Sequence, residues 1–308
     1  MNQNGLAGDV VKWIDKLPAA QLSSTPASIA VANAYAAVKN WSRVKRWTRT
    51  GMWGDSEYVR LAYQAVATRQ SRSRTGTPNS EFETLWRSAE QLASEQPERE
   101  LRLARLASKW ELAKESEDLW WRVAENPPMR REALEELQRV YRGKNETAKL
   151  YDVLERLHET SPNEAPITAD LARLGLNLGQ NTERSDQLAK EAYDRAPNEV
   201  NCAVTYAFSL LRLGRNAEAI AIIGSLPSDQ LRDPHASVYV ALLLAEANRI
   251  DAANKYIASA DDGGLYPEEE KLLEEVKTKL ATASATPSPA ISPVPPELSP
   301  TPSSTSAP

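Results

Sequence analysis

The chain has 308 residues, 26% of them charged, and a formal net charge of −5 at pH 7. Its single cysteine, Cys202, excludes an internal disulfide, and no apolar run reaches the roughly 18–20 residues of a membrane span. The first residues, MNQNGLAGDVVKWIDK, lack the basic region and apolar core of a signal peptide. We therefore expect a cytoplasmic protein with no membrane span in this chain.

The composition favours an all-α protein. Glycine occurs 12 times and phenylalanine twice, whereas leucine, alanine, glutamate and arginine, which favour helices, recur throughout. Valine and isoleucine seldom alternate with polar residues, so the sequence predicts no strand. We expect an opening helix at about 4–16 and a last helix that runs from 267 to about 279. Between them, helix pairs are expected at about 26–50, 55–95, 97–126, 129–160, 165–195, 199–226 and 234–260.

One short sequence occurs twice. LPAAQLSSTP begins at Leu17 and LPSDQLRDP begins at Leu226, so the two lie 209 residues apart (226 − 17). Two further landmarks, Pro-Asn-Glu and Leu-Gly, each recur after 35 residues, at Pro162 and Pro197 and at Leu178 and Leu213. A period of about 34–35 residues fits six times into 209, which indicates a repeated two-helix unit. Two such helices cannot bury their apolar faces alone, so successive pairs must stack.

Residues from about 145 to 260 resemble tetratricopeptide repeats (TPRs). The matching landmarks are a small residue in the first helix, a Leu-Gly turn, an alanine in the second helix, and a proline before the next repeat. The small residues and prolines are Ala172, Ala207, Ala241, Pro162 and Pro197. The early tryptophan of the family is absent here, and residues from about 25 to 128 match only as degenerate repeats. The resemblance implies a right-handed superhelix whose concave groove binds a peptide or a partner helix.

The resemblance also implies which residues face the groove. Arginine and asparagine in a groove can bind carboxylates and peptide backbone, which would favour an acidic or C-terminal peptide. The alternative is that these residues are solvated charges on helix surfaces. The candidate groove residues are Arg102, Arg105, Lys109, Arg173, Asn177, Asn201, Val204, Phe208, Arg212 and His235.

A basic segment, residues 39–74, offers a second binding hypothesis. Cations there alternate with Trp41, Trp47 and Trp53, and basic residues with aromatics can bind nucleic acid or an anionic surface. The alternative is that the tryptophans are core residues of degenerate repeats, so nucleic acid is the less favoured partner. The candidate anionic-partner patch is Arg43, Lys45, Arg46 and Arg49.

The sequence contains no recognisable catalytic, cofactor or metal motif. The two histidines, His158 and His235, lie in different repeats, and Cys202 has no evident base beside it and is expected to be a packing residue. Motifs for phosphate cradles, nucleophile elbows and zinc ligands are missing from the sequence. We therefore expect a non-enzymatic interaction scaffold that needs no cofactor.

We divide the chain into three segments. Residues 1–128 are degenerate, tryptophan-rich repeats, 129–280 are clearer repeats with a C-terminal capping helix, and 281–308 form a disordered tail rich in Pro, Ser and Thr. The opening helix resembles the second helix of a repeat whose first helix is missing. An alternative is therefore that the chain is the helical accessory region of a larger enzyme or of a membrane-anchored protein.

Overall fold

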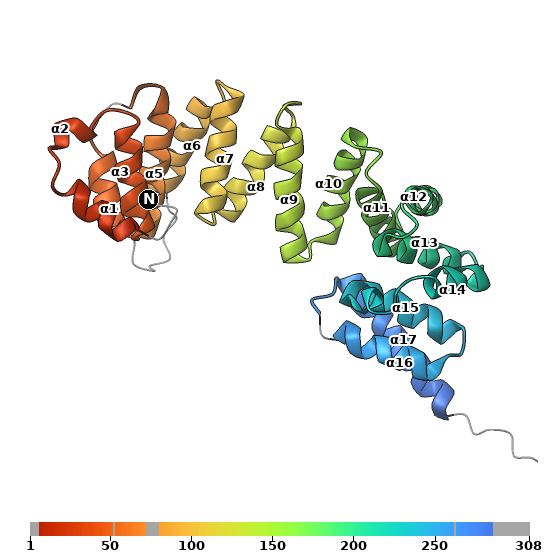
Figure 1. Ribbon diagram of the computed structural model, residues 1–308. Helices are drawn as coiled ribbons and strands as arrows, with labels where there is room; N and C mark the ends of the chain where they lie inside the picture. The colour runs from red at the N-terminus through yellow and green to blue at the C-terminus, as the bar shows by residue number, and fades with distance from the viewer. Residues whose placement is uncertain (1–5, 52, 72–79, 262, 286–308) are drawn as a thin grey trace, which may run out of the picture. The chain divides into compact units, whose positions relative to one another are not determined.

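The computed structural model describes residues 6–51, 53–71, 80–261 and 263–285, and this part of the chain contains α-helices, two 3-10 helices and no strand (Figure 1). The expected all-α fold is confirmed. The chain divides into two compact units, unit 1 (Met1–Asn163) and unit 2 (Glu164–Pro308). Most of the predicted disordered tail, from residue 286 onward, lies outside the described residues.

Unit 1 begins with two short helices, followed by four helix pairs in which consecutive helices pack together (Figure 1). A 3-10 turn, η2 (Gly54–Ser56), precedes the second pair. The helices are α1 (Ala7–Ile14), α2 (Ala19–Leu22), α3 (Ala27–Ala37), α4 (Trp41–Thr48), α5 (Glu57–Gln70), α6 (Ser80–Ala93), α7 (Pro97–Lys109), α8 (Ala113–Ala124), α9 (Arg130–Lys144) and α10 (Thr147–Thr160).

Unit 2 contains three helix pairs and a last, unpaired helix. A 3-10 turn, η3 (Gln230–Arg232), precedes the third pair. The helices are α11 (Ala165–Leu178), α12 (Thr182–Arg195), α13 (Val200–Arg212), α14 (Asn216–Gly224), α15 (Pro234–Glu246), α16 (Ile250–Asp261) and α17 (Pro267–Ala285). All seven predicted pairs are therefore present. Below, the earlier helix of a pair is its first helix and the later one its second helix.

The turn inside the helix pairs shows the repeat most clearly. From the third pair onward, a residue with left-handed backbone lies between the first and second helices, at Glu111, Asn145, Gly179, Gly214 and Asn248. These residues follow one another after 34, 34, 35 and 34 positions, which is the period predicted from the sequence. A left-handed residue ends a helix and satisfies its last carbonyl groups, so the same reversal recurs in each pair.

Small and large side chains share the packing between helices. Ala207, Ala219, Ala241 and Ala253 are completely buried at the expected small-residue positions, which lets neighbouring helices approach closely. In unit 1 the core uses larger side chains, among them Trp53, Trp86 and Trp120. These tryptophans are core residues, as one of the two sequence-based interpretations expected. We divide the chain at residue 128 because the repeat landmarks are clearer in the sequence after it. This division into segments 1–128 and 129–280 stays a prediction.

The last helix, α17, is longer than expected and contacts a helix outside the last pair. Pro267 stands in its first turn, followed by three glutamates that suit the positive end of the helix. The apolar residues Leu273, Val276 and Leu280 join the core formed by α13, α15 and α16. The sequence predicts a helix that caps the last pair and ends near Lys279. In the structure α17 packs on both helices of that pair, α15 and α16, but it runs to Ala285 and also contacts α11.

Candidate functional site

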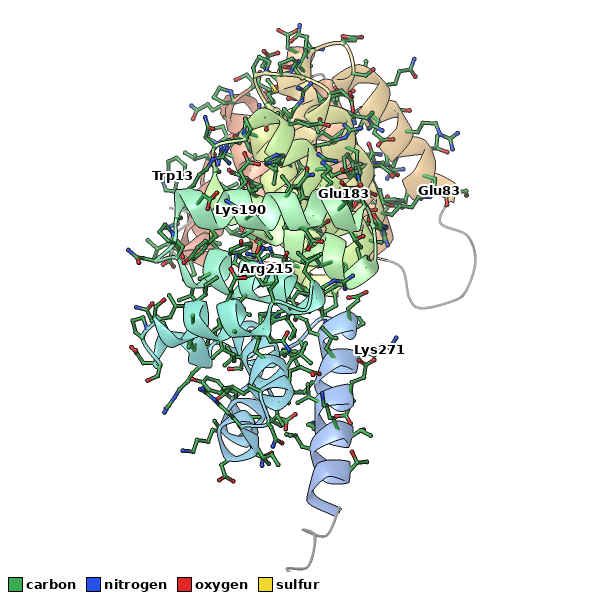
Figure 2. All side chains as sticks on the ribbon, turned by 90° about the vertical axis from the view of Figure 1, so that its right-hand side faces the viewer. Trp13, Glu83, Glu183, Lys190, Arg215 and Lys271 are labelled. Atoms are coloured by element: carbon green, nitrogen blue, oxygen red, sulfur yellow. The ribbon has the colours of Figure 1, made fainter. Side chains whose placement is uncertain are left out.

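The candidate site lies on the surface that α11, α13 and α15 form together, which we call the first-helix face of unit 2. α11 packs against α13, and α13 packs against α15, so the surface is continuous. α17 lies on it: α17 contacts α11 and α15, and a pocket of about 170 Å³ is lined by residues of α11, α13 and α17. Lys271 of α17, labelled in Figure 2, lines this pocket. α17 thus occupies the place that the resemblance assigns to a partner.

A carboxylate of α17 is the buried centre of this contact. Glu269 is fully buried, and its two oxygens are shared by three groups. Tyr239 donates from its hydroxyl to Oε1 at 2.9 Å, the backbone N–H of Tyr266 donates to Oε2 at 3.1 Å, and His235 Nδ1 lies 2.6 Å from Oε2. Tyr239 and His235 are one turn apart on α15, so one helix presents both side chains to the carboxylate.

A second layer of polar contacts holds the groups that surround Glu269. Arg173 donates to Asn201 Oδ1 at 2.8 Å and to Asp170 Oδ1 at 3.1 Å, and Asn201 Nδ2 donates to the same Asp170 oxygen at 2.8 Å. Asn177 Nδ2 donates to the hydroxyl of Tyr239 at 2.6 Å. The guanidinium of Arg173 lies 5.9 Å from the centre of the Tyr239 ring. The sequence positions from three repeats therefore meet in one network.

The charges of this network favour an ionised Glu269. Burial alone would raise its pKa, but the hydrogen bond with His235, the positive charge of Arg173 and the Tyr266 N–H outweigh burial, so the pKa lies below its ordinary value. Burial, together with the charge of Glu269, raises the pKa of Tyr239 well above its ordinary value. Tyr239 therefore stays neutral and donates, while Glu269 stays charged and accepts.

The network keeps unused hydrogen-bonding capacity. Two of its buried atoms, Arg173 Nε and Asn177 Oδ1, have no hydrogen-bond partner among the described residues. A buried polar atom without a partner costs free energy, about 1–3 kcal/mol. Asn177 also borders the 170 Å³ pocket beside α17.

The other groove candidates of unit 2 have different roles. Val204 is completely buried in the core and Phe208 is almost completely buried. Arg212 donates to the carbonyl oxygen of Leu176 at 3.1 Å, and its guanidinium lies 5.8 Å from the centre of the Phe208 ring. Arg212 and Phe208 also line the pocket beside α17. The structure thus brings Arg173, Asn177, Asn201 and His235 together, with Arg212 nearby.

The basic stripe of α7 is mostly engaged inside unit 1. Arg105 forms a two-point contact with Glu132 of α9, with both distances at 2.7 Å. Lys109 donates from Nζ to Asn33 Oδ1 of α3 at 2.7 Å, and partial burial lowers its pKa. Arg102 is exposed. Two of the three stripe residues therefore link helices of different pairs.

The anionic-partner patch on α4 is partly neutralised. Arg43 Nη1 lies 2.8 Å from both carboxylate oxygens of Asp15, and Lys45 Nζ lies 3.3 Å from Glu81 Oε1. These acids compete with any anionic partner for the two cations. The other two members of the patch, Arg46 and Arg49, are exposed.

The tryptophans near this patch offer little surface for base stacking. Trp53 is buried with 3% of its surface exposed, and Trp47 is half-buried and donates from Nε1 to the carbonyl oxygen of Ser28 at 3.1 Å. Trp41 is half-buried as well. Stacking needs an accessible aromatic face, so these contacts favour a packing role for the three side chains.

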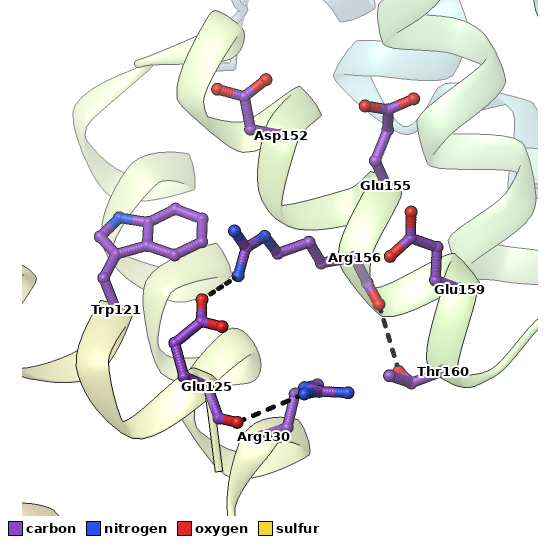
Figure 3. A pocket seen from close by; sticks show the side chains of 8 residues that line it. All are labelled: Trp121, Glu125, Arg130, Asp152, Glu155, Arg156, Glu159 and Thr160. Carbon is purple, nitrogen blue, oxygen red and sulfur yellow. Dashed lines mark hydrogen bonds and ion pairs between the residues drawn. The ribbon is translucent and has the colours of Figure 1, made fainter. Parts of the chain in front are cut away.

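A larger polar pocket lies between α8 and α10 in unit 1 (Figure 3). Its volume is about 790 Å³. The guanidinium of Arg156 lies 5.1 Å from the centre of a Trp121 ring and 2.6 Å from Glu125 Oε1, and Arg130 Nε donates to the Ala124 carbonyl at 2.9 Å. Both arginines are thus held by the pocket's own walls. The lining residues are Trp121, Glu125, Arg130, Asp152, Glu155, Arg156, Glu159 and Thr160.

The single cysteine and the metal-binding residue types can be compared with the sequence-based expectations. Cys202 is buried, and burial raises the pKa of its thiol to about 11, so it is a protonated packing residue at neutral pH. Within the described ranges, no group of three His, Cys, Asp or Glu side chains is arranged to hold a metal ion. Nor does any described helix have both the length and the apolar character to cross a membrane.

Sequence reasoning missed two essential members of the network. Glu269 is the second of three consecutive glutamates and looks like an ordinary acidic helix start. Tyr239 looks like one more core residue of α15. The available signal was the four-residue spacing of His235 and Tyr239, which places a donor pair on one side of a first helix.

Comparison with known proteins gives little information about the family of this chain. No protein-family model and no curated protein matches the chain. Among solved structures, the chain is similar to a thermophilic TPR protein of Thermus thermophilus, with a TM-score of 0.39 and 17% sequence identity, covering 60% of this chain and 100% of the other. The stacked helix pairs and the recurring left-handed turn carry the assignment: the fold is a TPR-like helical-repeat solenoid, as the sequence predicts.

Proposed function

We propose that this TPR-like protein is a non-enzymatic interaction scaffold that binds a helix of a partner protein on the first-helix face of unit 2. The observation that carries the proposal is the set of contacts around the buried side chain of Glu269. A buried carboxylate accepts from Tyr239 and the Tyr266 N–H, pairs with His235, and lies in the field of Arg173. Charge-assisted hydrogen bonds of this kind are stronger than neutral ones and recognise one chemical group.

The resident helix indicates what the partner looks like. After Glu269, α17 buries Leu273, Val276 and Leu280, which follow the glutamate at positions +4, +7 and +11. That spacing places the carboxylate and the three apolar side chains on one helical stripe. The partner is therefore a helix with Glu followed by apolar residues at these three positions.

A partner helix must displace α17 from this surface, so it must bind more strongly than the docked α17 does. Burying three aliphatic side chains stabilises the docked helix by about 5–9 kcal/mol, taking about 1.5–3 kcal/mol for each. A tethered helix also benefits from a high effective concentration. Replacement in trans therefore needs a partner with additional contacts or a weakened α17.

The test uses a synthetic peptide with the sequence of α17. In the full-length chain, Glu269→Lys places a cation beside Arg173 and loosens the resident helix, while circular dichroism checks that the remaining repeats stay helical. We expect the peptide to bind this variant with micromolar affinity and the wild-type chain far more weakly. A peptide carrying Glu269→Gln should bind about 10-fold to 100-fold more weakly, since a hydrogen bond to a charged group contributes about 1.5–3 kcal/mol.

The matched control is a peptide with Glu270→Gln, because Glu270 is exposed on α17. It should bind as the unchanged peptide does. If the peptide fails to bind a folded Glu269→Lys chain, or if both glutamine peptides bind alike, α17 is a structural element and the proposal is wrong.

A further inference from the structure

Glu269 stands at a special position, the third residue of its helix. α17 starts at Pro267, so Tyr266 is the residue that precedes the first turn. The Tyr266 N–H donates to Glu269 Oε2 at 3.1 Å, and the Tyr266 carbonyl accepts the first hydrogen bond of the helix from the Glu270 N–H at 2.9 Å. A glutamate that accepts in this way from the residue before the helix forms one half of a capping box.

The two residues before the helix are buried together with Glu269. Leu265 has 4% of its surface exposed and Tyr266 has 6%, and Leu265 belongs to the core that α13, α15 and α16 share. The ring of Tyr266 packs on the ring of His235, with the ring centres 5.0 Å apart and an angle of 37° between the ring planes. The same histidine pairs with Glu269 through Nδ1. One side chain of α15 therefore contacts both the residue before the helix and the third residue in it.

Capping alone does not require a buried glutamate. α7 also begins with a proline, Pro97, and carries Glu98 and Glu100 in its first turn, yet neither of these glutamates is buried. The burial of Glu269 therefore comes from the docking of the helix start on α15.

A glutamate inside a helix could not make the same contacts. In a helix interior, the N–H three residues before the glutamate donates to the carbonyl of the preceding turn, so it is not available to the side chain. Pro267 prevents such a continuation, because a proline disfavours helical backbone at the residue before it and has no N–H to donate. The face thus makes a contact that depends on the first turn of a helix.

We propose that the first-helix face of unit 2 recognises the beginning of a helix, with an aromatic residue before a proline and a glutamate at the third helical position. His235 is the specificity-determining residue, because it contacts both the aromatic ring and the carboxylate. Where it concerns a partner, the inference rests on the proposed function and narrows it. A partner helix starts at this point of the face and does not run across it, and its sequence reads aromatic, proline, any residue, glutamate.

The test compares two peptides that differ in one residue. Both carry residues 266–285 behind the helix-forming lead AEAAAKA; one keeps Pro267 and the other has Pro267→Ala, so that only in the second does the helix run through Tyr266. The receptor is the full-length chain with Tyr266→Ala and Glu269→Lys, which removes both resident side chains from their places, and circular dichroism checks that it stays helical. We expect the peptide with Pro267 to bind about 10-fold more tightly or better in calorimetry. Helicity alone predicts the reverse order, because the alanine peptide is better ordered before it binds.

Single substitutions in a peptide of residues 264–285 test the aromatic position. Tyr266→Ala should weaken binding about 10-fold or more, since the burial of an aromatic side chain is lost. Thr278→Ala, at an exposed position of α17, should bind as the unchanged peptide does.

The outcomes separate this inference from the proposed function. If the peptide with Pro267→Ala binds as tightly as its counterpart or more tightly, or if Tyr266→Ala has no more effect than Thr278→Ala, the inference is overturned while the proposed function stands. If no peptide binds the folded receptor, the proposed function itself fails, and the inference falls with it.

Discussion

His235 and Glu269 lie 34 residues apart in the chain, one repeat length, and their side chains meet with Nδ1 2.6 Å from Oε2. The first belongs to α15 and the second to α17, so the pair joins a first helix to the helix that lies on it. The first-helix face of unit 2, which the resemblance predicts to bind a partner, is therefore already covered by a helix of this chain. The predictions below follow from that arrangement and from the repeat geometry.

Replacing the buried carboxylate should weaken unit 2. Glu269→Gln keeps the side-chain size but removes the charge that His235, Tyr239 and Arg173 surround. We expect the free energy of unfolding to fall by about 1.5–3 kcal/mol. Urea denaturation measures this, and hydrogen exchange should show faster exchange in α17. Glu270→Gln, at an exposed position, should change stability by less than about 0.5 kcal/mol; equal losses in both variants would contradict the account.

Acid should remove the same contribution. The folded-state pKa of Glu269 lies below 4.5, its ordinary value, so the unfolded chain binds the proton more readily than the folded one. The stabilisation is complete above about pH 4.5 and is lost as the pH falls through the folded-state pKa. We therefore expect the stability difference between wild type and Glu269→Gln to shrink below about pH 4.5. A difference that grows on acidification would show that the sign is wrong.

The turn before α17 depends on one glycine. A Cβ atom at Gly263 would lie 2.2 Å from Pro234 Cβ, at the start of α15, whereas a Cβ at Gly264 would meet nothing within 4 Å. Gly263→Ala should therefore force α17 and α15 apart and destabilise unit 2 by about 1–3 kcal/mol. Gly264→Ala is the matched control and should be close to neutral. Thermal unfolding of the two variants distinguishes them, and identical Tm values would contradict the close contact.

The left-handed turn of the third pair should improve with glycine. Glu111 has φ of 55°, where a side chain costs about 1–2 kcal/mol, while Gly179 and Gly214 fill the matching positions of later pairs. Glu111→Gly should raise the free energy of unfolding by about 0.5–1 kcal/mol after the entropy cost of glycine is subtracted. Glu111→Ala keeps a Cβ and should bring no gain. A loss of stability in Glu111→Gly, measured by urea denaturation, would show that the Glu111 side chain has a role of its own.

The sequence predicts the repeats well because each repeat is local. The Leu-Gly landmarks at Gly179 and Gly214 lie where the chain reverses in the structure, and the expected helix pairs are all present. The docking of α17 could not be predicted in this way. It depends on contacts between Glu269 and residues far from it in the chain, and a three-glutamate helix start has the same sequence whether it faces water or a core.

The groove residues were inferred from the resemblance to tetratricopeptide repeats, and their role in binding stays a prediction. The resemblance places Arg173 and Asn177 on the groove side of α11, and both belong to the observed network. It also places Val204 and Phe208 on the groove side of α13, but they are buried, because an apolar side chain on a first helix packs into the neighbouring helices. Whether a side chain on one side of a helix is exposed depends on which other helices pack there, and the spacing of residues along the helix does not show this.

The most direct measurement is a double-mutant cycle between the partner carboxylate and its receptor. Calorimetry would measure the binding of the α17 peptide, with and without Glu269→Gln, to the Glu269→Lys chain, with and without Tyr239→Phe. Since the Tyr239 hydroxyl donates to Glu269 at 2.9 Å, the account predicts that the two losses do not add. The coupling energy should be about 1 kcal/mol or more, so that the double change weakens binding roughly fivefold less than the product of the two single effects. A coupling energy of zero, with both peptides binding the folded chain, would show that the carboxylate is not recognised by this network.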